Sequence, residues 1–202
     1  MLLSIHPEHP QPRKVARAAD LIRDGQILAY PTDTGYGLGC DPFQRKTVER
    51  LFRLLSLPDR KRASLLCKDF KQMAVYGYIS DFVYRKARKV FPGPYTLIVE
   101  ATKAIPKPLR GKRREVGIRV PNQNVLLALL EELDSPILNV TARDFQGEYL
   151  DDPHEIESVY RKSLGAVIDG DLLPESSSTV IDLTGDYPEV VRLGQGDPDI
   201  FL

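Results

Sequence analysis

The sequence has few of the residues that build disulfide scaffolds or metal centres. Its 202 residues include two cysteines, Cys40 and Cys67, and three histidines. The cysteines do not form a C-x-x-C motif, and no histidine lies near a cysteine or a carboxylate at the spacing of metal ligands. We therefore expect two reduced, buried thiols and no structural metal.

Net charge and long apolar runs are lacking as well. Lys plus Arg number 28 and Asp plus Glu number 28, so any affinity for a polyanion must come from local clustering of charge. No stretch approaches the ~18 continuous apolar residues of a membrane helix. Residues 1–12 lack the basic and apolar regions of a signal peptide. We therefore expect a cytoplasmic protein that does not contact a membrane.

The composition that remains is that of a globular protein. Hydrophobic residues make up 42% of the chain and charged residues 28%, which is enough to bury a core. The length fits one domain over residues 1–202, with a core at about 12–196. Apolar residues at helical spacing alternate with short apolar runs that end at Pro or Gly.

The alternation predicts an α/β fold. We expect a twisted, mixed sheet of parallel and antiparallel strands with flanking helices. The interleaved helices favour a mostly parallel centre, and the closely spaced late strands favour antiparallel additions. The predicted helices are 12–25, 48–58, 80–90, 125–133 and 152–163, and the predicted strands are 26–30, 63–67, 95–100, 116–120, 136–141, 166–169, 179–183 and 189–193.

The segment Pro31-Thr32-Asp33-Thr34-Gly35-Tyr36-Gly37-Leu38-Gly39 combines hydroxyl groups, a carboxylate and alternating glycines. We expect the preceding strand to end at Pro31 and this segment to form a ligand-binding loop, because ligands bind at the carboxyl ends of strands in α/β sheets. The glycine spacing alone is equally typical of a tight strand connection. Asp33 either contacts magnesium through water or caps the turn. Tyr36 is expected in the core.

This segment resembles the opening signature P-T-D-T-x-Y-G-L-G of the YrdC-like family, which includes threonylcarbamoyl-AMP synthases. Later phrases of the family follow in order, and the resemblance spans roughly residues 12 to 196. It implies a YrdC-like fold. The later phrases are residues 92–96 (PGPYT), 117–121 (GIRVP), 178–182 (STVID) and 191–194 (VRLG).

The resemblance implies a reaction of L-threonine, bicarbonate and ATP that gives threonylcarbamoyl-AMP and pyrophosphate, on the way to threonylcarbamoyladenosine in tRNA. ATP would bind with magnesium, which is held mainly by phosphates and water. Such a site needs cations for the phosphates and hydroxyl groups for oxyanions. The candidate catalytic residues are Thr32, Thr34, Arg119 and Thr141, and the candidate nucleotide-binding residues are Arg62, Arg143, Ser178 and Arg192.

Two departures indicate the YciO branch of the family. Synthases carry K-x-R-P where residues 55–58 read LSLP, and S-x-N where residues 141–143 read TAR. Losing one donor to the transition state costs about 2.7–4 kcal/mol, so we expect weak or diverged synthase activity. Replacement cations are available if Arg60, Lys61, Arg62 or Arg143 turns inward. The alternatives are a non-catalytic nucleotide- or RNA-binding protein and a hydrolase of a related adenylate.

Residues 107–114 collect five cations in eight positions. A solvated loop is the simpler interpretation, because exposed lysines and arginines are common. The functional interpretations are a flap over a triphosphate and a patch that contacts an RNA backbone.

Overall fold

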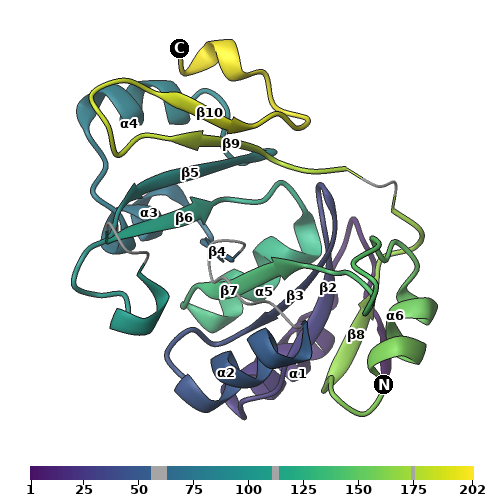
Figure 1. Ribbon diagram of the computed structural model, residues 1–202. Coiled ribbons are helices and arrows are strands. Elements are labelled where there is room, and N and C mark those ends of the chain that lie inside the picture. The colour runs from purple at the N-terminus through teal and green to yellow at the C-terminus, as the bar shows by residue number, and fades with distance from the viewer. Residues whose placement is uncertain (56–62, 111–113, 174–175) are drawn as a thin grey trace.

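The computed structural model of the chain describes residues 1–55, 63–110, 114–173 and 176–202. Its strands form one ten-stranded sheet in the order β1-β8-β2-β3-β7-β4-β6-β5-β9-β10 (Figure 1). The strands are β1 (Leu2–Ser4), β2 (Leu28–Thr32), β3 (Gly35–Cys40), β4 (Ser64–Leu66), β5 (Tyr95–Glu100), β6 (Glu115–Arg119), β7 (Ile137–Thr141), β8 (Ala166–Asp169), β9 (Thr179–Asp182) and β10 (Glu189–Arg192). The mixed sheet expected from the sequence is confirmed.

Six α-helices of the described residues flank the sheet. They are α1 (Pro12–Arg23), α2 (Arg45–Leu54), α3 (Phe70–Tyr76), α4 (Asp81–Ala87), α5 (Asn124–Leu133) and α6 (Pro153–Tyr160), with short 3-10 turns η2 (Lys107–Leu109) and η3 (Pro198–Ile200). Helix α3 was not predicted, and the predicted helices 80–90 and 152–163 end earlier, at Ala87 and Tyr160.

Local sequence explains where several helices start and stop. Pro12 occupies the first turn of α1, where its missing N–H group costs nothing, and Gly25 follows the helix with a φ of +76° that favours glycine. Asp152 accepts a hydrogen bond from the backbone N–H of His154 at 2.8 Å and so caps α6. The carboxylate of Asp69 caps α3 in the same way.

The two faces of the sheet carry separate hydrophobic clusters. Strand side chains alternate between them, so Leu28 and Tyr30 pack with α1 and α5, whereas Ala29 packs on the opposite face. The opposite face contains apolar residues of α2, α3, α4 and α6. Helix α5 packs through its buried residues Val125, Leu126, Leu129 and Leu130.

The prediction that the first long strand ends at Pro31 is wrong. Strand β2 continues to Thr32 and pairs antiparallel with β3, so most of the expected ligand loop is itself a strand. Proline is tolerated because the ladder from β2 to β8 involves Leu28 and Ala29, and Pro31 lies beyond it. The glycines of β3 serve packing: a Cβ at Gly39 would lie 2.0 Å from the hydroxyl group of Tyr30.

The expectation of a mostly parallel centre is also wrong. Strand β3 pairs antiparallel with both β2 and β7, and β7 pairs antiparallel with β4. Parallel ladders join β8 to both β1 and β2, β4 to β6, and β5 to β9. Among the late strands, β10 is an antiparallel addition, because it pairs with β9 in the antiparallel direction.

The sheet curls strongly along its length. In Figure 1, β2 and β8 run in a clearly different direction from β5, β6 and β9. Strands β2 and β6 run in opposite directions, because three antiparallel ladders and one parallel ladder separate them. Their carboxyl ends would lie at opposite edges of a flat sheet, so curling is what allows them to meet.

Candidate anion-binding site

One face of the sheet is covered by α1 and α5 over part of its length. On the same face, strands β6, β5 and β9 present polar residues. Val116 and Ile118 point into the core on the other face, so Gly117 and Arg119 belong to this one. On this face, α1 and α5 pack against each other and against β2. The polar part of the face therefore lies beside these helices.

Arg119 links the two halves of the curled sheet. It lies at the carboxyl end of β6, and its side chain is 5% exposed. Its Nη1 donates to Oγ1 of Thr34 at 2.7 Å, and its Nη2 donates to Oδ1 of Asp33 at 2.5 Å. Both acceptors lie in the turn between β2 and β3. A buried arginine in an apolar strand requires such partners, because an unpaired buried charge is very costly.

Thr32 and Thr34 lie next to each other beside Arg119. The hydroxyl oxygens of Thr32 and Thr34 lie 3.3 Å apart. The hydroxyl group of Thr32 donates to the carbonyl oxygen of Gly35 at 2.7 Å and accepts from the backbone N–H of Thr34 at 3.0 Å. The hydroxyl group of Thr32 therefore fixes the turn, and that of Thr34 contacts Arg119 directly.

Arg192 is fixed to the start of β9 by several donors. Its Nε and Nη2 donate to the carbonyl oxygen of Ser178 at 3.1 and 2.9 Å, and Nη2 also reaches the Oγ of Ser178 at 3.0 Å. The hydroxyl oxygens of Ser178 and Thr96 lie 2.9 Å apart. Thr96 lies one position before the pair of Leu97 and Ile118, which places it opposite Arg119.

Arg143 lies just past the carboxyl end of β7. The backbone N–H of Ala142 donates to the carbonyl oxygen of Tyr36 at 2.9 Å, so the chain places Arg143 beside Gly35 and close to Thr34. The guanidinium carbon of Arg143 lies 3.8 Å from the centroid of the Tyr149 ring. Its Nη1 donates to the carbonyl oxygen of Gly147.

The electrostatics of these residues favour an anionic ligand. Burial lowers the pKa of Arg119, while the Asp33 carboxylate opposes that shift. Burial also lowers the pKa of Arg192, and the positive charges of Arg119 and Arg143 lower it further. Arg119 and Arg143 thus each lie close enough to Arg192 to act on it, yet arginines remain charged at neutral pH. We call these three arginines with Thr34 and Asp33 the Arg119 cluster.

Two buried atoms of the Arg119 cluster have no hydrogen-bond partner in the described part of the chain. They are Nε of Arg119 and Oδ2 of Asp33. Buried polar groups are normally satisfied, so exceptions need an explanation. A ligand with an acceptor near Arg119 and a donor near Asp33 would satisfy both.

Most of the predicted site residues with described side chains gather here. Thr32, Thr34, Arg119, Ser178 and Arg192 join in the contacts above, and Arg143 approaches them from β7. Thr141 lies at the end of β7 opposite Gly37 and is half-buried. Arg62 lies outside the described residues, as do Arg60 and Lys61, so they stay predictions.

The sequence interpretation missed Asp33 and Tyr149 as partners of Arg119 and Arg143, and Thr96 as the partner of Ser178. In the structure Asp33 forms an ion pair with Arg119, which the sequence interpretation did not predict, and its contact with magnesium stays a prediction. The signal for that pair was a single arginine within the apolar strand that ends at Val120, which must find a carboxylate. Nothing in the linear sequence indicated the contacts of Thr96 and Tyr149, because both depend on folding.

Several other residues take structural roles. Tyr36 is 2% exposed, so its predicted place in the core is confirmed. Cys40 and Cys67 are free and buried, also as predicted. Asp182 accepts hydrogen bonds from the backbone N–H and the hydroxyl group of Thr184, which is a structural role. In the basic stretch, Arg110 donates to the carbonyl oxygens of Lys103 and Ile105, and residues 111–113 lie outside the described part.

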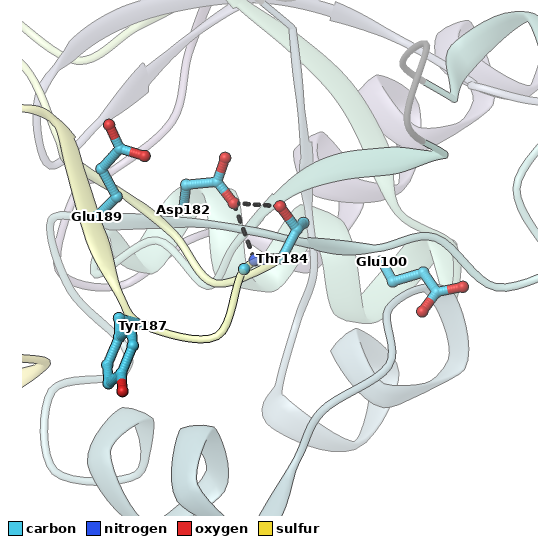
Figure 2. A pocket seen from close by; sticks show the side chains of 6 residues that line it. Glu100, Asp182, Thr184, Tyr187 and Glu189 are labelled. Atoms are coloured by element: carbon cyan, nitrogen blue, oxygen red, sulfur yellow. Dashed lines mark hydrogen bonds between the residues drawn. The ribbon is translucent and has the colours of Figure 1, made fainter.

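A separate hollow lies near the opposite ends of β5, β9 and β10. Its lining includes Glu100, Asp182 and Glu189. Figure 2 shows Glu100 pointing away from the other two carboxylates, so the three do not converge on one cation. The described residues contain no group of three or more His, Cys, Asp or Glu side chains suited to a metal ion. This acidic lining would repel a phosphate.

None of the helices in the described ranges is both long and apolar enough to cross a membrane.

Comparison with protein families gives one match over most of the chain. The family model Sua5/yciO/yrdC, described as telomere recombination, matches residues 20–194. The uncharacterized protein YciO of Escherichia coli is 38% identical over 98% of this chain and 97% of its own length. A threonylcarbamoyl-AMP synthase of Pyrococcus abyssi is 29% identical over 90% of this chain, which spans 54% of that synthase.

Solved structures show the same fold. The crystal structure of E. coli YciO is 37% identical, with a TM-score of 0.94 over 100% of this chain and 99% of the other. The crystal structure of P. abyssi Sua5 complexed with L-threonine is 26% identical, with a TM-score of 0.86 over 96% of this chain and 57% of that one. The expected YrdC-like fold is thereby confirmed.

Proposed function

Because the chain belongs to the Sua5/YciO/YrdC family, we propose that it is a nucleotide-dependent enzyme of the threonylcarbamoyl-AMP synthase type. Its substrates would be L-threonine, bicarbonate and ATP, with magnesium arriving on the ATP phosphates. The support from relatives is a synthase at 29% identity and a Sua5 structure that holds L-threonine.

One observation carries the proposal. Three guanidinium groups are each fixed on one side by protein acceptors and leave other N–H groups free of described partners, including the buried Nε of Arg119. Donors held in place before the ligand arrives stabilise developing negative charge without reorganising, which is the largest single contribution in many enzymes. The ligand that fits such an arrangement carries several negative charges.

The chemistry of the proposed reaction matches this charge. The amine of threonine attacks the carbon of carbon dioxide and loses a proton, or attacks that of bicarbonate with loss of water, and forms a carbamate. An oxygen of the carbamate then attacks the α-phosphorus of ATP, and pyrophosphate leaves. Negative charge builds on the carbamate oxygens in the first step and on the phosphate oxygens in the second. Arg119 and Arg192 would hold these oxygens, and the hydroxyl group of Thr34 would orient Arg119 toward them.

Turnover would be lower than in a synthase that keeps the K-x-R-P phrase. Residues 55–58 supply no cation there, although Arg143 adds one at a position where the synthases have asparagine. Each donor that is lost without replacement reduces the rate by about a hundred- to a thousand-fold. RNA binding by residues 107–114 stays a prediction.

Pyrophosphate release tests the proposal. The purified protein is incubated with magnesium, ATP, L-threonine and bicarbonate, and the nucleotide products are separated by mass spectrometry. We expect pyrophosphate that disappears when either threonine or bicarbonate is omitted, together with threonylcarbamoyl-AMP. Binding of ATP without pyrophosphate would favour the non-catalytic alternative. Hydrolysis of added threonylcarbamoyl-AMP without its synthesis would favour the hydrolase.

A further inference from the structure

Arg143 is held in one orientation by a tight hairpin that follows β7. The backbone N–H of Asp144 donates to the carbonyl oxygen of Glu148 at 2.8 Å, and that of Leu150 donates to Ala142 at 3.2 Å. Gly147 has a φ of +94°, a conformation that favours glycine. The hairpin thus fixes both ends of the segment that carries Arg143.

The side chain of Arg143 is fixed as well as its backbone. Its guanidinium group stacks on the Tyr149 ring at 3.8 Å, and its Nη1 donates to the carbonyl oxygen of Gly147. Such a stack is attractive because the positive plane lies on the negative face of the ring. Among the described residues, the side chain of Arg143 donates only this hydrogen bond from Nη1, so Nε and Nη2 are available to a ligand. They form one edge of the planar guanidinium group.

The Arg143 guanidinium belongs to the Arg119 cluster by position. The β3–β7 pairing places its backbone beside Gly35, and the adjacent Thr34 binds Arg119 at 2.7 Å. Tyr149 and Arg143 both lie near enough to Arg192 to act on its pKa, which Tyr149 raises and Arg143 lowers. Arg119 donates two hydrogen bonds to protein acceptors, and Arg192 donates three. Arg143 uses one, so it has more donors left for a ligand.

We propose that Arg143, oriented by Tyr149, binds a phosphate group of the nucleotide and makes the site prefer phosphorylated over unphosphorylated adenosine. The planar fork of an arginine matches two oxygens of one phosphate, which a lysine or an amide cannot do equally well. The inference rests on the proposed function, since it takes the nucleotide as the ligand. Tyr149 acts as a positioning residue.

Titration calorimetry with pyrophosphate, AMP and adenosine tests the inference on the full chain. Arg143→Gln removes the charge and should weaken the binding of pyrophosphate and AMP by about 10- to 100-fold, the effect of losing a charge-assisted hydrogen bond. Binding of adenosine should not change. Arg143→Lys keeps the charge without the planar fork. Its affinity for pyrophosphate and AMP should therefore lie between that of the unchanged protein and that of Arg143→Gln. Arg45→Gln is the control for net charge, because Arg45 is exposed on α2.

Variants of Tyr149 test the positioning role separately. Tyr149→Phe keeps the ring and should bind AMP within about two-fold of the unchanged protein. Tyr149→Leu removes the stack and should weaken AMP binding by about 2- to 30-fold, the range of a cation–π contact. Recovery by phenylalanine separates orientation of Arg143 from the loss of the phenolic hydroxyl group. Thermal unfolding of each variant checks that it is folded.

A direct readout is the Nε–H resonance of Arg143 in protein labelled with ¹⁵N-arginine. It is assigned by its absence in Arg143→Gln, and it should shift on addition of pyrophosphate. If the unchanged protein binds pyrophosphate but Arg143→Gln binds it equally well, the inference is overturned and the proposed function stands. If the unchanged protein binds neither pyrophosphate nor AMP, both fail.

Discussion

At the scale of single residues, the ion pair between Asp33 and Arg119 determines how the site is built. The Asp33 side chain is 13% exposed and that of Arg119 is 5% exposed, so both charges are largely removed from water. Such a pair adds little net stability compared with apolar residues, but removing one partner leaves an uncompensated charge. Its value to the protein is the fixed position of the Arg119 guanidinium.

Neutralising Asp33 should therefore destabilise the fold. Asp33→Asn leaves Arg119 charged and buried, and we expect the free energy of unfolding in urea to fall by about 3 kcal/mol. The control is Asp20→Asn, which removes the carboxylate of an exposed ion pair with Arg23. That change should cost less than about 1 kcal/mol. Equal costs for the two variants would show that the buried pair is not special.

The buried thiols give a prediction about alkaline pH. Burial raises the pKa of Cys40 to about 12, whereas an unfolded cysteine titrates near ~8.5. The folded state therefore holds its proton more tightly, and the stability contributed by the neutral thiol is lost as the pH rises between these two values. The free energy of unfolding should fall on raising the pH from about 9 to about 12.

Replacing Cys40 measures how much of this decrease in the free energy of unfolding comes from its thiol. In Cys40→Ala, the loss of stability per pH unit should be smaller by about 1.4 kcal/mol in that window. Burial also raises the pKa of Tyr30 and Tyr36, so part of the slope remains in the variant. Identical slopes for the two proteins would mean that Cys40 ionises freely in the folded state.

At the scale of elements, β3 shows what glycine contributes to this sheet. The Tyr30 side chain crosses the backbone of β3 and donates to the Oδ1 of Asn139 at 3.0 Å. A Cβ at Gly37 would lie 2.1 Å from that same oxygen, and one at Gly39 would lie 2.8 Å from the carbonyl oxygen of Leu138. The glycines therefore make room for a tyrosine and its hydrogen bond.

Gly39→Ala should be strongly destabilising for this reason. The added methyl group meets backbone as well as side-chain atoms, and overpacking of this kind costs about 1–3 kcal/mol. Gly185→Ala is the matched control, since the nearest atom to its Cβ is a carbonyl oxygen at 3.7 Å. We expect the control to stay within about 0.5 kcal/mol in urea unfolding. A stable Gly39→Ala protein would contradict the packing role.

Most elements could be predicted from the sequence, and their pairing could not. Periodicity locates α1, α5, β5 and β8 well, because each depends on local pattern and local stop signals. Strand β3 reads as a loop, since three glycines give it no apolar alternation and its stability comes from pairing with β2 and β7. Strand β1 has three residues and depends on β8 in the same way.

At the scale of the whole molecule, the site depends on the curl of the sheet. Thr34 and Arg119 are 85 positions apart in the chain and lie at the ends of strands that run in opposite directions. The motif resemblance named both residues, but it carried no information on how they meet. The contacts of Asp33 with Arg119, of Thr96 with Ser178 and of Tyr149 with Arg143 follow from the folded geometry, which explains why linear patterns missed them.

The most direct test of the account is pyrophosphate release by two variants of Thr34, measured beside the unchanged protein. Thr34→Val keeps the shape of the side chain but removes the oxygen that accepts from Arg119, and Thr34→Ser keeps that oxygen. We predict that release dependent on threonine and bicarbonate falls by about a hundred-fold in Thr34→Val. It should stay within about three-fold in Thr34→Ser, because the acceptor for Arg119 is kept. Full activity in Thr34→Val, or an equal loss in both variants, would contradict the assignment of the Arg119 cluster as the site of the reaction.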